Sequence, residues 1–147
     1  MIKISKLADY GVFILSTLSH YSGYLSAKCI SECTSISMPT VSKLLKILET
    51  HDVLVSKLGK KGGYKLSADP KKISLLEIVN IVDGEFELTS CSLERTKCRL
   101  SSKCTLHNAW GKINLIITNL LQQISLYDLV HNIKLEGHIC CKHLNSD

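Results

Sequence analysis

The chain has 147 residues, a formal net charge of +5 and seven cysteines, and 45% of its residues are apolar. This length fits one domain or a small domain with an appendage, and the apolar content excludes a disordered chain. No apolar run reaches the roughly 18 residues of a membrane span, so we expect no contact with a membrane. The apolar stretch near the N-terminus keeps a helical period, which favours a mature helix over a secretion signal and predicts a cytoplasmic protein with reduced thiols.

The basic charge lies in the first half of the chain. Residues 1–72 carry 11 Lys+Arg against five Asp+Glu, a balance of +6, whereas residues 73–147 carry seven against eight, a balance of −1. Such a division is typical of a nucleic-acid-binding module joined to a sensing or oligomerising module. A lysine face that is merely solvated would give the same count, so the charge alone does not decide between the two.

Hydrophobic periodicity predicts three helices, a hairpin and a fourth helix over the first 84 residues. The first two helices are expected at about residues 5–21 and 26–33, and the third begins at Ser37 or Met38. Strands at 53–58 and 64–66 flank a glycine-rich turn at 59–63, and residues 74–82 form the fourth helix. The second and third helices, joined by a four-residue turn, predict a helix-turn-helix arrangement.

The outward face of the third helix carries residue types that suit DNA recognition. A helix fits the major groove, where Ser, Thr and Lys side chains reach base edges and phosphates, and a hairpin tip can rest on the adjacent backbone. The predicted DNA contacts are Ser37, Pro39, Thr40, Ser42, Lys43 and Lys46 in the helix, and Lys60, Lys61 and Gly62 in the hairpin. An ordinary helical domain with a surface hairpin is the alternative, because helix pairs and glycine-rich turns are common.

Three cysteines precede the longest predicted helix, and a histidine lies in its first turn. Cys91, Cys98, Cys104 and His107 follow the spacing C-x6-C-x5-C-x2-H. Thiolates bind soft metals, and one histidine among cysteines occurs in both zinc and iron–sulfur sites. The wide spacing, without a C-x2-C pair, favours an iron–sulfur cluster over structural zinc, with plain or redox-reactive cysteines as a third interpretation. A histidine on the first turn of a helix is often simply solvated, so His107 stays an open candidate.

The remaining four cysteines receive no role from the sequence. Cys29 and Cys33 lie on the second predicted helix, where a cysteine usually serves as a small core residue. Cys140 and Cys141 lie in a tail that is expected to be flexible.

The longest helix is predicted from about residue 105 to residue 124, and residues 125–131 add one or two further turns. Its apolar stripe includes Trp110, which we expect in the core. So wide an apolar face is more than one small domain can cover, and it predicts packing against a second copy of the chain.

Several segments together match a known pattern. They are ISKLADY at 4–10, ISMPTVSKL at 36–44, GKKGGYKL at 59–66, Asp69-Pro70 followed by Ile73-Ser74-Leu75, and the three cysteines. In this combination the chain resembles the IscR/NsrR family of bacterial iron–sulfur transcription regulators over roughly residues 1–130. Within that family it is most similar to the regulators of the SUF iron–sulfur assembly system.

The resemblance implies a mainly α fold with a small β-hairpin wing, that is, a winged helix-turn-helix with a long C-terminal dimerisation helix. It implies an iron–sulfur cluster of the 2Fe-2S type, with 4Fe-4S as the alternative, bound by Cys91, Cys98 and Cys104. The fourth ligand would be His107 or Asp9, which aligns with an acid on the first helix that can come from the other subunit. The first cysteine gap is one residue longer than in the best-known members, and Ser42 stands where some relatives carry a glutamate, so the operator sequence cannot be copied from them.

These expectations divide the chain into a winged helix-turn-helix DNA-binding domain (1–84), a cluster-binding loop (85–104), a dimerisation helix (105–131) and a flexible tail (132–147). The predicted function is that of a homodimeric repressor on double-stranded DNA, which senses iron or oxidative or nitrosative state and controls iron–sulfur assembly genes. The alternatives are an iron–sulfur electron or cluster carrier without DNA binding, and a zinc- or thiol-based redox repressor. No nucleophile–base pair or phosphate loop is visible, so we expect neither an enzyme nor a small-molecule substrate.

Overall fold

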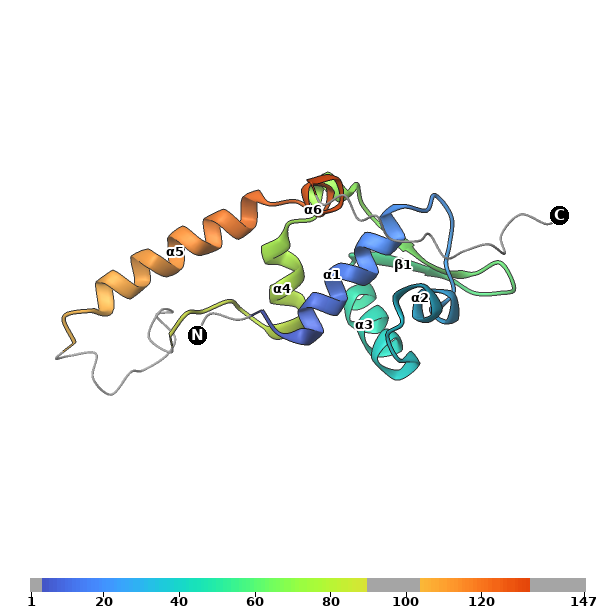
Figure 1. Cartoon of the computed structure of the whole chain (residues 1–147), viewed down its shortest axis with the longest axis horizontal. Helices are drawn as coiled ribbons and strands as arrows, with labels where there is room; N and C mark the ends of the chain where they lie inside the picture. The colour runs from blue at the N-terminus through green and yellow to red at the C-terminus, as the bar shows by residue number, and fades with distance from the viewer. Residues whose placement is uncertain (1–3, 90–103, 133–147) are drawn as a thin grey trace.

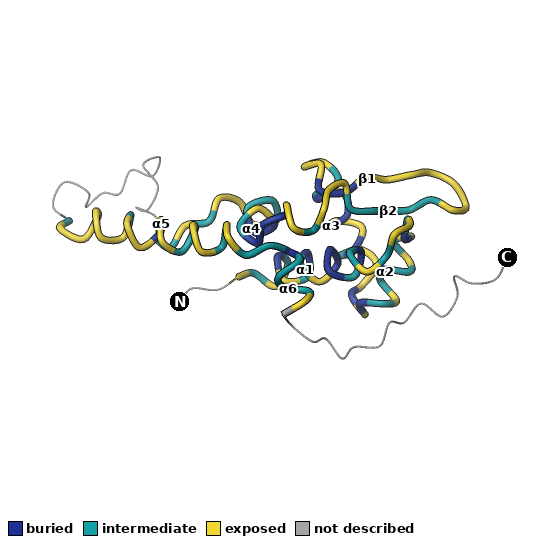
Figure 2. The backbone as a smooth tube through the Cα atoms, turned by 90° about the horizontal axis from the view of Figure 1, so that it is seen from above, coloured by how far each residue is buried: buried dark blue, intermediate teal, exposed yellow. Residues whose placement is uncertain are grey.

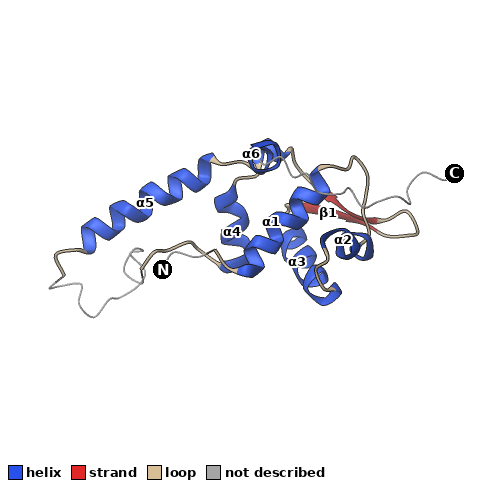
Figure 3. Cartoon of the chain, in the orientation of Figure 1, coloured by secondary structure: helices blue, strands red, loops and turns tan. Residues whose placement is uncertain are grey.

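The computed structural model describes residues 4–89 and 104–132, and within them it confirms a mainly helical fold with a two-stranded hairpin (Figures 1 and 3). The elements in chain order are α1 (Lys6–Ser19), α2 (Ala27–Thr34), α3 (Met38–Thr50), β1 (Leu54–Lys57), β2 (Gly63–Leu66), the short 3-10 helix η1 (Pro70–Lys72), α4 (Leu75–Asp83), α5 (His107–Gln123) and α6 (Leu126–Asn132). The predicted helices are present, with ends shifted by one or two residues. None of the helices in these ranges has the length and apolar character that crossing a bilayer requires.

Serine side chains set the starts of three helices. Ser5, Ser26 and Ser74 each precede a helix and accept a hydrogen bond from a backbone N–H in its first turn, a donor that the helix itself leaves unpaired. The donors are the N–H groups of Ala8 (3.0 Å), Cys29 (3.2 Å) and Glu77 (3.1 Å). Helix α3 begins differently, because Ser37 precedes it without such a bond and Pro39 occupies its first turn, where a missing N–H costs nothing.

The core of the head, which we define as α1 to α4 with the hairpin, lies where the four helices meet. Each helix turns an apolar stripe inward with repeats of three and four residues. The large helical side chains that are fully buried in the head are Ile14, Leu15, Leu18, Ile30, Val41, Leu44, Leu45, Leu48 and Ile78. Burying one such side chain contributes roughly 1.5–3 kcal/mol, so the head is stabilised by contacts within a single chain.

The hairpin is attached to the head through its second strand. β1 and β2 pair antiparallel, with Lys57 opposite Gly63. Tyr64 exchanges two backbone hydrogen bonds, of 3.0 and 2.8 Å, with Leu25 in the connection between α1 and α2. Gly63 lies against that connection with φ +142°, and a Cβ there would come 2.2 Å from the Leu25 carbonyl oxygen. Only glycine fits this position.

Helix α5 begins far from the head and runs back toward it, and α6 then packs against the head (Figure 1). After α5 the chain turns at Ile124, whose carbonyl accepts from the N–H of Leu75, and Leu126 then donates to the carbonyl of Ile73, both at 2.8 Å. Leu126 is fully buried in the core of the head, and α6 packs on η1 and α1. Residues 105–131, expected to act together as a dimerisation helix, thus form two helices, and the second is part of the head's packing.

Helix α5 is largely exposed along its length (Figure 2), and in the described part of the chain its apolar stripe is exposed as well. We define the α5 stripe by its exposed members, which are Leu106, Trp110, Ile113, Ile116 and Leu120, with exposed fractions from 38% to 67%. The prediction that Trp110 is a core residue is therefore wrong for the single chain, because α5 meets the head mainly along α4 and turns this stripe elsewhere. Tertiary placement, not periodicity, decides which face of an amphipathic helix is covered.

Candidate functional site

Helix α3 buries one face and exposes the other. Its buried side chains are Val41, Leu44, Leu45 and Leu48. Of the predicted DNA contacts on this helix, Thr40 is half-buried and the others are exposed, namely Ser37, Pro39, Ser42, Lys43 and Lys46. The hydroxyls of Ser37 and Thr40 lie 2.9 Å apart, in hydrogen-bond contact at the start of the helix. The outward side of α3 thus offers short hydroxyl donors and two ammonium groups, which can meet base edges and phosphates.

The turn between α2 and α3 is held by side chains of α2. Ser35 adopts the left-handed conformation with φ 57°, which ends α2. The Ser31 hydroxyl donates to the Ile36 carbonyl at 2.6 Å, and the Thr34 hydroxyl donates to the Ile30 carbonyl at 2.7 Å. The Thr34 bond is buried and lies within the last turn of α2, whereas the part-buried Ser31 bond reaches across the turn and ties α2 to the residues just before α3.

The hairpin tip presents the two predicted lysines. Lys60 and Lys61 are exposed, and Gly62 is half-buried at the turn. A Cβ at Gly62 would lie 2.1 Å from the Lys57 carbonyl oxygen, so the hairpin itself requires this glycine. Sequence reasoning missed Leu58, whose side chain is 98% exposed beside the lysines. An apolar residue next to a basic, glycine-rich turn was the available signal.

Among the described residues, the basic groups of α3 and the hairpin tip have no carboxylate as an ion-pair partner. The ion pair found in the described part of the chain joins Lys28 and Glu32 on α2, at 4.0 Å with both side chains well exposed. The lysines of the predicted interface, Lys43, Lys46, Lys60 and Lys61, are exposed and form no ion pair within residues 4–89 and 104–132. Their charge is therefore available to an anionic partner.

The predicted metal ligands are only partly covered by the structure. Cys91 and Cys98 lie outside the described residues. Cys104 is half-buried just before α5, which begins at His107, and Asp9 is exposed in the first turn of α1. Among the described residues no three His, Cys, Asp or Glu side chains gather as a metal site. The ligand set thus stays a prediction.

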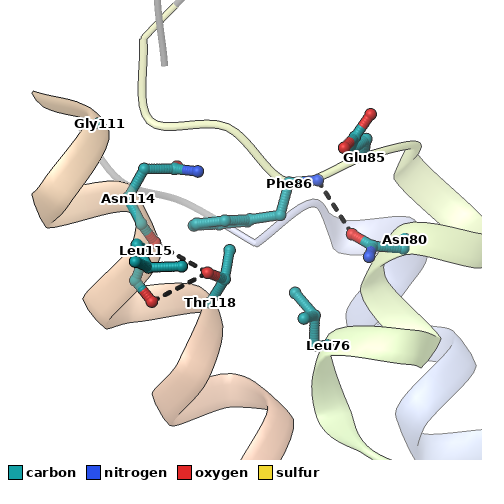
Figure 4. A pocket seen from close by; sticks show the side chains of 8 residues that line it. All are labelled: Leu76, Asn80, Glu85, Phe86, Gly111, Asn114, Leu115 and Thr118. Carbon is teal, nitrogen blue, oxygen red and sulfur yellow. Dashed lines mark hydrogen bonds between the residues drawn. The ribbon is translucent and has the colours of Figure 1, made fainter. Parts of the chain in front are cut away.

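Two asparagine side chains hold the segment that leads to Cys91, and Figure 4 shows them. The Asn80 amide oxygen, on α4, accepts from the Phe86 N–H at 2.9 Å. The Asn114 amide oxygen, on α5, accepts from the Leu88 N–H at 3.0 Å, and Asn114 is only 6% exposed. Sequence reasoning missed both, although Asn in a helix interior is unfavourable unless its side chain has a specific partner.

The same region forms a pocket of about 440 Å³ between α4 and α5. Its lining residues are Leu76, Asn80, Glu85, Phe86, Gly111, Asn114, Leu115 and Thr118. In Figure 4 the Phe86 ring points from the segment after α4 toward α5. The segment is thus connected to both helices, by hydrogen bonds from its backbone N–H groups to two asparagine side chains and by an aromatic side chain.

Helices α2 and α3 are joined by a short turn, and α3 exposes a polar face. A basic two-stranded hairpin follows them. This arrangement defines the winged helix-turn-helix class of DNA-binding proteins. The comparison with protein families agrees with this class. The chain belongs to the Rrf2 family, whose model is described as an iron-dependent transcriptional regulator and matches residues 4–132.

Individual relatives point the same way. The chain is 30% identical over 115 residues to the transcriptional regulator IscR of Cronobacter sakazakii. The matched region covers 78% of this chain and 70% of that relative. The solved structure of T. potens IscR matches with a TM-score of 0.67 and 26% identity, over 89% of this chain and 88% of that structure. The structure of CymR, the global cysteine regulator of B. subtilis, matches with a TM-score of 0.71 over 90% of this chain and 99% of that one, but at 21% identity it supports the fold alone.

Proposed function

We propose that this transcriptional regulator is a cytoplasmic repressor whose operator affinity depends on a bound iron–sulfur cluster, and that it controls iron–sulfur assembly genes. The observation that carries this proposal is the attachment of the segment before Cys91 to both α4 and α5, through Asn80 and Asn114. The family description as iron-dependent regulators and the similarity to IscR support the iron–sulfur part.

The donor chemistry of the cysteine-bearing segment fits such a cluster. Cys91, Cys98 and Cys104 supply thiolates, the usual ligands of iron–sulfur clusters of either the 2Fe-2S or the 4Fe-4S type. For the fourth ligand we propose His107, three residues after Cys104, or the exposed Asp9 of the partner subunit. When bound, the cluster supplies a group that responds to iron supply and to oxidative or nitrosative conditions.

The chain's own contacts provide the route from this segment to the DNA-binding head. Asn80 belongs to α4, which packs against α1 and α3, whereas Asn114 belongs to α5. A displacement of residues 86–88 therefore acts on the helix that supports α3 and on the helix that extends from the head. Because Asn114 is buried, breaking its bond to the half-buried Leu88 leaves a buried amide oxygen without this partner, which favours movement of the connected parts as a unit.

For DNA recognition we propose that α3 enters the major groove and the wing rests on the backbone. Thr40, Ser42 and Lys43 would reach base edges, and Lys60 and Lys61 would contact phosphates. The other predicted contacts, Ser37, Pro39, Lys46 and Gly62, lie beside these residues on the same two elements. The exposure of these lysines and the lack of neutralising ion pairs in the described ranges support this assignment.

We further propose that the protein acts as a homodimer joined through the α5 stripe. The five exposed apolar side chains of the α5 stripe are unfavourable in water. The α5 stripe of a second copy can cover them in a two-fold symmetric contact, in which each stripe packs against the other. Two heads joined in this way would read half-sites about 34 Å apart, one turn of B-form DNA.

The test compares the wild type with Cys98→Ala, both purified without oxygen. We expect the variant to lose visible absorbance, iron and sulfide, and to differ from the wild type in operator affinity by about tenfold or more, within the range of ordinary allosteric coupling. Cys140→Ala is the matched control, because it removes a cysteine outside the predicted ligand set and should keep both properties.

Unchanged absorbance and unchanged affinity in Cys98→Ala would contradict the proposal. A wild type that contains zinc and no iron would support the zinc- or thiol-based repressor instead. A protein that contains iron and sulfide but gives no footprint on its own upstream DNA would support the carrier.

A further inference from the structure

Cys29 and Cys33 form a pair of thiols on α2, in the helix-turn-helix unit itself. Positions i and i+4 share one face of a helix, and here the two sulfur atoms lie 4.0 Å apart. Both residues are half-buried, and Cys29 packs against the core of the head. The sequence pattern gives these two cysteines no role, and the proposed function does not involve them.

The sulfur–sulfur distance distinguishes between two kinds of chemistry. A disulfide requires about 2.05 Å between the sulfurs, so the two atoms would have to approach by about 2 Å within a hydrogen-bonded helix. Two thiolates about 2.3 Å from one metal ion lie roughly 3.8 Å apart at a tetrahedral angle and roughly 4.6 Å apart in a linear arrangement. The observed 4.0 Å falls between these values, so a shared metal ion fits with little movement.

The helix also favours the form of sulfur that binds metals. Cys29 lies in the first turn of α2, and its N–H is held by the Ser26 side chain at 3.2 Å. The positive end of a helix dipole stabilises an anion there, and the thiolate is the form of cysteine that coordinates a metal. Packing of Cys29 against the core restricts its side chain, which lowers the entropy lost on binding.

We propose that Cys29 and Cys33 bind one soft, thiophilic metal ion of low coordination number, of the class of monovalent copper. Thiolates select such ions over hard cations. Two sulfurs from one helix suit an ion that takes two thiolates, whereas structural zinc takes four ligands. Because α2 packs on α3, the bound ion lies within the head.

The experiment titrates the full-length, cluster-free protein with Cu(I), without oxygen, against a chromophoric Cu(I) chelator. We expect the double variant Cys29→Ser with Cys33→Ser to take up one equivalent fewer than the wild type, and each single variant to bind that equivalent about tenfold or more weakly. Two matched controls, Cys140→Ser with Cys141→Ser, and Cys91→Ser with Cys98→Ser and Cys104→Ser, should keep the equivalent that depends on α2. Equal uptake and equal affinity in the wild type and the double variant would overturn the proposal.

A second measurement uses the unaltered protein and does not depend on the folding of variants. Cu(I) at one equivalent should protect Cys29 and Cys33 from alkylation, as read by peptide mass spectrometry. Protection confined to other cysteines overturns the copper site and leaves the proposed repressor function untouched. Loss of cluster binding in Cys98→Ala tests that function and leaves the copper site untouched.

Discussion

The head buries its apolar side chains, whereas α5 leaves many of its apolar side chains exposed. The head closes its core within one chain, and side chains such as Leu45 and Ile78 are fully buried. Helix α5 has the same kind of amphipathic pattern, yet Ile116 is 67% exposed and Leu120 is 57% exposed. Only Asn114, a polar residue, is buried among the α5 side chains that the structure describes. The two patterns look alike in sequence, but in the described part of the chain the head covers its apolar stripes, whereas α5 covers few apolar side chains, such as Leu121, and leaves the α5 stripe exposed.

This difference teaches which part of the molecule can be stable alone. The head has caps, a shared core and a hairpin that is bonded to the α1–α2 connection, all within one copy. Helix α5 touches the head mainly through α4 and the segment held by Asn80 and Asn114. We therefore expect substitutions in the head to change folding and substitutions in the α5 stripe to change self-association.

The largest effect is expected in the core of the head. Leu45→Ala removes a fully buried side chain of α3 and should lower the free energy of unfolding by about 2–5 kcal/mol. Denaturant unfolding followed by circular dichroism measures this loss. Leu115→Ala, at 60% exposure on α5, is the control and should change it much less. Equal losses in the two variants would erase the distinction between the head and α5.

The next largest effect is expected on self-association. Ile116→Asp places a charge in the α5 stripe and removes an apolar side chain. Burial of such a side chain contributes roughly 1.5–3 kcal/mol. The dissociation constant of the dimer should therefore rise by about tenfold to a hundredfold. Analytical ultracentrifugation measures it, with Lys112→Asp as a control on an exposed, polar position of the same helix. A variant that stays fully dimeric at low concentration would exclude the stripe as the contact.

A smaller effect is expected at the wing, which belongs to the head but faces outward. Lys60→Ala with Lys61→Ala should weaken binding to all DNA sequences about equally, because phosphate contacts carry no base information. The log–log slope of affinity against salt should fall by about 0.9 for each phosphate that the variant no longer neutralises. Fluorescence anisotropy at several salt concentrations measures the slope. Unchanged binding at ~0.15 M salt would remove the wing from the interface.

The smallest effect concerns the return of α6 to the head. Hydrogen bonds from the Ser125 hydroxyl and N–H to Asp128 lower the pKa of this carboxyl below its ordinary value of 3.8. Because the folded-state pKa is the lower one, its contribution to stability is present above the ordinary pKa and is lost as the pH falls through the folded-state value. Asp128→Asn should therefore show a slightly weaker loss of stability in acid than the wild type, measured by thermal unfolding across that range. An identical pH profile would show that this cap does not stabilise the folded chain.

Much of the local structure follows from the sequence because its causes are local. Apolar residues spaced three and four positions apart indicate the helices, and a glycine-rich turn between two short strands indicates the hairpin. Serines stand directly before α1, α2 and α4. These local signals place the elements within one or two residues. The outward face of α3 follows as well, since a buried stripe on one side of a helix leaves its polar residues on the other. Cys91 and Cys98 lie outside the described residues, so the ligand set remains a prediction from spacing and resemblance.

Other features depend on contacts between residues that are distant in the sequence, and only the tertiary structure decides them. Asn114 accepts from Leu88, 26 positions earlier, and Leu126 joins the core through a backbone bond to Ile73. The exposure of Trp110 also depends on tertiary contacts, because the sequence of an amphipathic helix does not determine which neighbour packs on its apolar face. The sequence alone thus determined the elements, the basic first half and the three spaced cysteines, since these depend on composition and short-range order. The tertiary structure decided how α6 packs on the head, how two asparagines hold the segment before Cys91, and that the α5 stripe is exposed in the described part of the chain, since each of these depends on which distant parts of the chain meet.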